Sequence, residues 1–101
     1  MNLRNCKFLQ QIPDLSGAPN LIELCLDGCI SLTEIHDSVG CLRKLRELSA
    51  MRCRNLKILP SCLKLTSLKQ LNLFNCSSLQ RFPEISVMME EMQTLDLDKT
   101  A

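Results

Sequence analysis

Aromatic residues are nearly missing from this chain of 101 residues, which contains three phenylalanines and neither tryptophan nor tyrosine. A core without aromatic rings has to be built from aliphatic side chains, and the sequence is rich in leucine. Single-stranded nucleic acid is a poor candidate ligand, because such sites stack bases on several aromatic side chains. The formal net charge of +1 points the same way. No nucleic-acid partner is expected.

The residue types that carry catalysis and metal binding are also sparse. The three glycines form neither a P-loop nor a dinucleotide pattern. The only histidine, His36, has no nucleophile and orienting group in a catalytic pattern around it, so it is interpreted as a solvated loop residue. Cys25 and Cys29 have the spacing of one ligand pair, but they point to opposite sides of a predicted strand and have no second pair. The sequence therefore predicts no enzyme, no cofactor and no metal site.

Signals for secretion and membrane insertion are absent as well. The first ten residues carry Arg4 and Lys7 among polar side chains, and no apolar run is long enough to span a bilayer. The number of cysteines is odd, and Cys25, Cys41 and Cys62 are not spaced as a disulfide framework. Reduced thiols in the cytoplasm or nucleus are therefore expected, without membrane contact.

The most regular feature present is a cysteine that recurs at nearly constant intervals in a frame of leucines. Each cysteine closes the pattern L-x-L-x-x-C, with Met1 in place of the first leucine in one unit and Ala50 in place of the second in another. It is followed by leucine three positions later and by an isoleucine, leucine or phenylalanine six positions later. In three of the four units a proline comes next. The members of this cysteine ladder are Cys6, Cys29, Cys53 and Cys76. A period of about two dozen residues is typical of leucine-rich repeats.

The repeat predicts an α/β solenoid, a leucine-rich-repeat arc with a concave parallel β-sheet and convex return segments made mostly of loop and 3₁₀ turns. Leucines of the L-x-L core point inward by strand alternation, and the cysteine ladder is interpreted as buried and structural. The whole chain, 1–101, is one repeat segment with units at 1–20, 21–44, 45–67, 68–91 and, in part, 92–101. Neither end carries a polar cap, so the chain is expected to be a segment of a longer protein or a truncated product.

Residues that point outward from the predicted strands form the candidate partner-binding surface. Met51 and Phe74 are its predicted centre, because methionine and an aromatic ring inside a charged rim have the composition of an interface hot spot. The alternative is a cross-strand pair in which the two side chains only cover each other. The candidate residues on the concave face are Glu23, Cys25, Asp27, Arg46, Glu47, Ser49, Met51, Arg52, Lys69, Gln70, Asn72, Phe74 and Asp96.

Charge is distributed in bands along the chain. All charged side chains from Asp14 to Asp37 are acidic, all from Arg43 to Arg81 except Glu47 are basic, and those from Glu84 to Asp98 are acidic again. In a solenoid the order along the chain is also the order along the axis, so such bands can steer a protein partner and fix its register. The alternative interpretation is an ordinary set of solvated faces.

The unit at 68–83, LKQLNLFNCSSLQRFP, resembles the repeats of plant intracellular disease-resistance receptors. Among these it is most similar to nucleotide-binding leucine-rich-repeat proteins with a TIR-type N-terminal domain, and the stretches PDLSGAPNL at 13–21 and LDGC at 26–29 add to the match. The resemblance implies a role in plant immunity, in which the repeat region helps to recognise a pathogen effector or host protein and restrains the other domains of the receptor. His36 for proline, Ala50 for leucine and Thr100 for cysteine depart from the pattern.

A second class of function fits the same repeat. A generic intracellular leucine-rich-repeat scaffold that joins two signalling proteins needs the same parallel sheet and the same outward side chains. A P-loop nucleotide-binding domain upstream of the repeats would distinguish the receptor from the scaffold.

Overall fold

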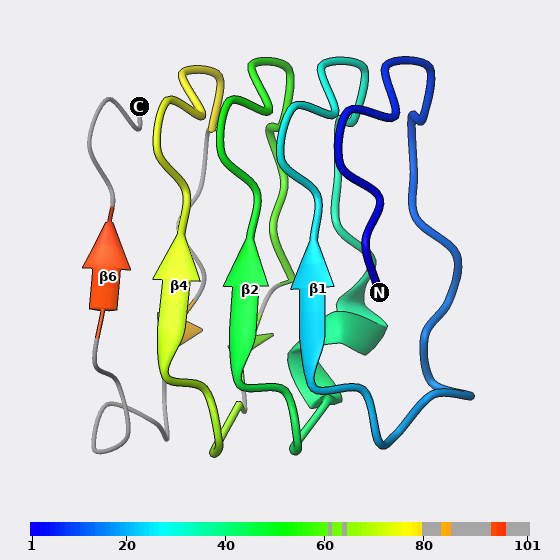
Figure 1. Ribbon diagram of the computed structural model, residues 1–101, viewed down its shortest axis with the longest axis vertical. Helices are drawn as coiled ribbons and strands as arrows, with labels where there is room; N and C mark the ends of the chain where they lie inside the picture. Colours follow the sequence, from blue (N-terminus) through cyan, green and yellow to red (C-terminus); the bar gives the residue numbers. More distant parts are fainter. Residues whose placement is uncertain (61, 64, 80–83, 86–93, 97–101) are drawn as a thin grey trace.

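The computed structural model describes residues 1–60, 62–63, 65–79, 84–85 and 94–96, of which 62–63, 84–85 and 94–96 are described by their backbone. Its main element is a four-stranded parallel sheet in which the strands lie side by side in chain order (Figure 1). The strands are β1 (Glu23–Cys25), β2 (Glu47–Ser49), β4 (Gln70–Asn72) and β6 (Thr94–Asp96). Each therefore pairs with its counterpart from the next sequence repeat.

The register of the sheet matches equivalent positions of the sequence repeat. Leu24 pairs with Leu48, and Leu48 pairs with Leu71. Each of these leucines is buried between an exposed residue before it and a half-buried residue after it, as the two-residue period of a strand requires. An isolated parallel bridge from Asn2 to Cys25 continues the same ladder to the start of the chain.

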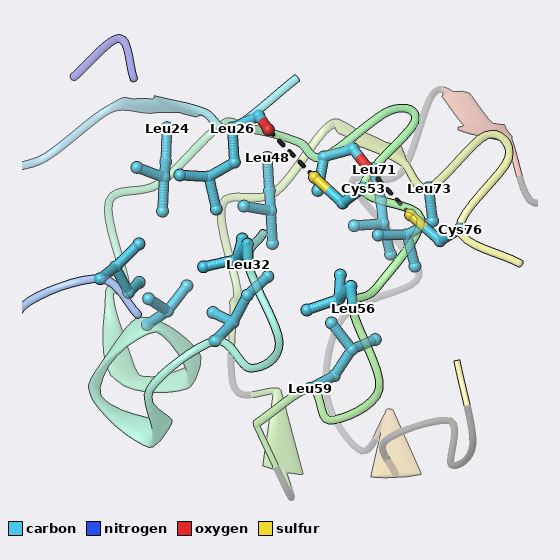
Figure 2. Packing of buried hydrophobic residues seen from close by; sticks show 14 of the residues in the cluster. Leu24, Leu26, Leu32, Leu48, Cys53, Leu56, Leu59, Leu71, Leu73 and Cys76 are labelled. Carbon is cyan, nitrogen blue, oxygen red and sulfur yellow. Dashed lines mark hydrogen bonds between the residues drawn. The ribbon is translucent and has the colours of Figure 1, made fainter. Parts of the chain in front are cut away.

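The hydrophobic core lies against one face of this sheet and is aliphatic apart from three thiols. The large side chains buried most completely are Leu24, Leu26, Leu32, Ile35, Leu45, Leu48, Leu56, Leu65, Leu68, Leu71 and Leu73. Figure 2 shows labelled leucines from three strands and their return segments converging on one another. Full burial of a leucine side chain contributes about 1.5–3 kcal/mol, so the regular leucines of the sequence explain how the core forms without aromatic rings among its described residues.

The cysteine ladder closes the turn after each strand. Cys29, Cys53 and Cys76 are fully buried and Cys6 is half-buried. Each buried thiol donates to a main-chain carbonyl of the preceding repeat, from Cys29 to Leu3 with an Sγ–O distance of 3.1 Å. The corresponding distances are 3.0 Å from Cys53 to Leu26 and 2.9 Å from Cys76 to Ala50 (Figure 2). The thiols therefore join neighbouring repeats, in addition to filling core space.

The residue before each cysteine has a left-handed backbone. These positions are Asn5, Gly28, Arg52 and Asn75, with φ between 61° and 75°. Glycine and asparagine tolerate this conformation, whereas a long side chain with an ordinary Cβ is strained there. Arg52 is therefore the exception among the four turns.

The return segments contain more regular structure than the sequence indicates. A 3₁₀ helix, η1 (Asp37–Cys41), fits the expected 3₁₀ turns, and His36 caps it by accepting a hydrogen bond from Ser38 N at 3.0 Å. A second parallel ladder, which the sequence analysis did not predict, joins Gln11 to Glu34 and Glu34 to Ile58. The strands β3 (Cys62–Leu63) and β5 (Glu84–Ile85) also pair in parallel on the return side. Equivalent positions of successive repeats thus also pair in parallel at several described places in the return segments.

Candidate protein-binding surface

The outward face is defined here as the side of the β1–β2–β4–β6 sheet opposite the buried Leu24, Leu48 and Leu71. The sheet register places the candidate residues on it in columns that cross the strands. Glu23, Glu47 and Gln70 form an exposed column, and Cys25, Ser49 and Asn72 form a half-buried one. Asp96 continues the second column at β6 through its backbone. The spacing of the sequence repeat therefore predicts these columns.

Asp27 departs from the sequence prediction because its side chain is buried, with an exposed fraction of 4%. Its Oδ1 accepts hydrogen bonds from Ser49 Oγ at 2.5 Å and from Met51 N at 2.8 Å. Its Oδ2 lies 3.8 Å from a guanidinium nitrogen of Arg4. The carboxylate thus holds three successive repeats together, and it is buried in this structural link instead of exposed on the outward face as the sequence predicts.

Met51 and Phe74 occupy successive positions of the next column. Gly28 N donates to the carbonyl of Met51 at 2.8 Å, and Arg52 N donates to that of Phe74 at 2.7 Å. Both side chains are half-buried, which is less exposure than the sequence analysis assumed. Asn72 fixes the turn at Phe74 by accepting from its main-chain N–H at 3.0 Å. The two residues are therefore held in a fixed place on the outward face.

The basic candidates lie at two different ends of the strands. Arg52 is exposed in the turn after β2, beside Met51. Arg46 and Lys69 come directly before β2 and β4 and line a surface depression of about 450 Å³. The other described residues that line it are not among the predicted binding residues, and they are Ile22, Lys44, Thr66 and Ser67. Ile22 could have been found from its column, because it occupies in its repeat the place of Arg46 and Lys69.

The buried thiols of the cysteine ladder are poorly suited to act as nucleophiles. Burial raises the pKa of the Cys29 and Cys76 thiols, and it raises that of Cys53 to about 12. Cys41 is exposed at the end of η1. Within the described residues, no three histidine, cysteine or acidic side chains are grouped as a metal site would need. No described helix has the length and apolar character needed to cross a membrane.

The chain is similar in sequence to curated plant proteins whose names refer to disease resistance. Disease resistance protein RPP4 of Arabidopsis thaliana is 43% identical over 87 residues, which make up 86% of this chain and 8% of that protein. TMV resistance protein N of Nicotiana glutinosa is 42% identical over 79 residues, or 78% of this chain and 7% of that protein. Disease resistance protein RPS6 of Arabidopsis thaliana is 42% identical over all 101 residues, which make up 9% of its length.

These matches confirm that plant disease-resistance proteins are homologues of the chain, as the residues at 68–83 indicate. The chain spans less than a tenth of the length of these relatives. No family model matches the chain, and no solved structure matches it.

Proposed function

We propose that the chain is a leucine-rich-repeat recognition region of a plant immune receptor of the TIR-type nucleotide-binding class. In this role its repeats form an arc, a pathogen effector or host protein binds to the outward face, and contacts with the other receptor domains restrain the nucleotide-binding switch. The chain itself supplies protein binding and no chemistry, in the cytoplasm or nucleus. The observation that carries the proposal is identity of about 40% to disease-resistance proteins over most or all of the chain.

The geometry supports a binding role for the outward face in particular. Three-residue strands in register repeat the same two outward positions, one on each side of the buried central leucine in β1, β2 and β4. Such a sheet is rigid, because buried leucines on its other face and the thiol–carbonyl bonds fix each strand. Rigid display of side chains reduces the entropy lost on binding.

A leaf-response assay tests the proposal. The gene product that contains the chain is expressed in leaves, and cell death is measured with and without pathogen challenge. Met51→Asp with Phe74→Asp should abolish the pathogen-dependent response or produce cell death without the pathogen. The first result corresponds to lost recognition and the second to lost restraint.

A matched control introduces the same two aspartates at exposed apolar residues away from the outward face. Phe8 and Ile58 are 93% and 53% exposed, and Phe8→Asp with Ile58→Asp should leave the response unchanged. Because Met51 and Phe74 are half-buried, Glu47→Lys with Gln70→Lys provides a second outward-face variant at exposed positions. If both outward-face variants behave as the control does, the proposal is wrong.

A further inference from the structure

Three residues form a row at the end of the sheet where β1, β2 and β4 begin. They are the residues directly before these strands, Ile22, Arg46 and Lys69. Arg46 N donates to the carbonyl of Ile22 at 2.7 Å, and Lys69 N donates to that of Arg46 at 2.8 Å. Parallel pairing spaces such residues by about 4.8 Å. Arg46 and Lys69 are therefore like charges on neighbouring chain segments, an arrangement that costs stability unless solvent or a ligand compensates it.

The depression at this row is lined by basic side chains and one apolar side chain. Among the described residues, its lining comprises three cationic side chains, two hydroxyls and one isoleucine: Lys44, Arg46, Lys69, Thr66, Ser67 and Ile22. None of these is a carboxylate. Lys44 Nζ donates to Asn20 Oδ1 at 2.9 Å, whereas neither Arg46 nor Lys69 forms an ion pair with any residue in the described part of the chain. Ile22 is 50% exposed.

An adjoining depression of about 190 Å³ limits the kind of ligand that fits. It shares Ile22, Arg46 and Lys69 with the first and adds Glu23, Glu47 and Gln70. The two glutamates are paired directly across β1 and β2 and are exposed. Negative charge therefore borders the basic depression on the side of the outward face.

We propose that the basic depression binds an acidic, partly apolar segment of a partner protein. A carboxylate of the segment pairs with the guanidinium of Arg46 and the ammonium of Lys69, and an apolar side chain covers Ile22. Arginine matches a carboxylate through two parallel N–H donors. The inference rests on the proposed function, since it states the chemistry of the partner that such a recognition region would bind.

A protein segment fits this site better than nucleic acid does. A phosphodiester backbone carries charge at every unit, so a strand that continues from the basic depression would meet Glu23 and Glu47. The described residues that line the two depressions include no aromatic ring for base stacking. A peptide can instead place one carboxylate next to one apolar side chain, as the lining requires.

The test uses the chain and three fluorescent probes in an anisotropy titration. The probes are a decapeptide of alternating glutamate and leucine, its lysine–leucine counterpart, and a single-stranded oligothymidylate with the charge of the acidic peptide. Arg46→Glu with Lys69→Glu should weaken acidic-peptide binding at least about tenfold, because attraction becomes repulsion. Ile22→Ser should weaken it about fivefold, through loss of apolar contact.

The control variant has the same change of net charge as Arg46→Glu with Lys69→Glu, but at two residues outside the depressions. Arg54 and Lys57 are exposed and lie outside both depressions, so Arg54→Glu with Lys57→Glu should change the affinity less than about threefold. All four substituted charges in these variants are at exposed or half-buried positions, and circular dichroism verifies that folding is retained. Equal losses in the two charge-reversed variants, absence of acidic-peptide binding, or tighter binding of the oligothymidylate would each overturn the inference.

Failure of this inference can be separated from failure of the proposed function. Met51→Asp with Phe74→Asp should leave acidic-peptide binding unchanged, because neither residue lines the depression. If the charge reversal has no effect on peptide binding while the leaf response still depends on Met51 and Phe74, the basic depression is not a binding site and the receptor role stands. If peptide binding behaves as expected but the leaf response ignores both surfaces, the receptor role is wrong.

Discussion

The thiol of Cys53 donates a hydrogen bond to the main-chain carbonyl of Leu26, one repeat earlier in the chain, with an Sγ–O distance of 3.0 Å. The same contact recurs from Cys29 to Leu3 and from Cys76 to Ala50. The regular spacing of the cysteines therefore has a chemical reason. Each buried main-chain carbonyl near the end of one strand needs a hydrogen-bond donor, and the thiol that follows the next strand supplies it. The thiols are structural connectors between repeats.

Removing one connector should destabilise the fold measurably. Cys53→Ala deletes the donor to Leu26 and leaves a small void in a fully buried place, so the free energy of unfolding should fall by about 1–3 kcal/mol. Urea denaturation provides the measurement. Cys41→Ala serves as the control, because this thiol is exposed and its loss should cost no more than about 0.5 kcal/mol. Equal effects at the two cysteines would contradict the connector role.

The free energy of unfolding should decrease in alkaline solution, because the buried thiol of Cys53 resists ionisation. Burial raises the pKa of Cys53 from 9.0 to about 12, so between these values the unfolded chain releases the thiol proton and the folded chain keeps it. The stabilisation is complete below pH 9 and is lost as the pH rises towards 12, by about 1 kcal/mol per pH unit from this group. Unfolding free energies measured from pH 8 to pH 10.5 should show a shallower decline for Cys53→Ser, which does not ionise there. An unchanged slope would exclude this cause.

Two substitutions at the residue before a cysteine should change the free energy of unfolding in opposite directions. Arg52 has φ 62° and is exposed, so Arg52→Gly should relieve backbone strain and raise the unfolding free energy by up to about 1 kcal/mol. Gly28→Ala should lower it, because φ is 75° and the added Cβ would meet the side-chain oxygen of Asn5. Thermal denaturation of both variants distinguishes a rise from a fall. Destabilisation by Arg52→Gly would show that the arginine side chain contributes more than its strain costs.

Asp27 provides a test of the link between neighbouring repeats on the outward face. Asp27→Ala leaves Ser49 Oγ and Met51 N without their acceptor and should cost about 2–3 kcal/mol. Ser49→Ala removes one donor and should cost about 1 kcal/mol. A double-mutant cycle should give a coupling energy of at least about 0.5 kcal/mol between the two residues. Additive effects would mean that the hydrogen bond contributes nothing to stability.

The sequence predicts the sheet because leucine spacing alone specifies it. Leu24, Leu48 and Leu71 recur with the period of the repeat and alternate with polar neighbours, so strand direction, register and inward side follow together. The core without aromatic rings follows from the same leucines. The left-handed turn could also be inferred at Gly28, where glycine precedes the cysteine. In the next repeat Arg52 occupies this place, and arginine does not indicate a left-handed backbone.

Features that depend on contacts between repeats could not be read from the spacing. Asp27 occupies an outward position, and only the three-dimensional arrangement shows that Ser49 and Met51 bury and bind its carboxylate. The parallel ladder through Glu34 has no alternating pattern of its own, because single bridges lack the length of a strand. The basic depression needs Ile22, whose role depends on its neighbours Arg46 and Lys69 rather than on its own chemistry.

Site-specific photo-crosslinking in leaf tissue tests most directly whether the outward face contacts a partner. Gln70 is exposed at the centre of that face, and Ile58 is exposed on the return side. A photoreactive amino acid at position 70 should produce a cross-linked protein product that depends on pathogen challenge, and the same residue at position 58 should not. Products formed from position 58 alone, or equally from both positions, would contradict the assignment of partner binding to the outward face.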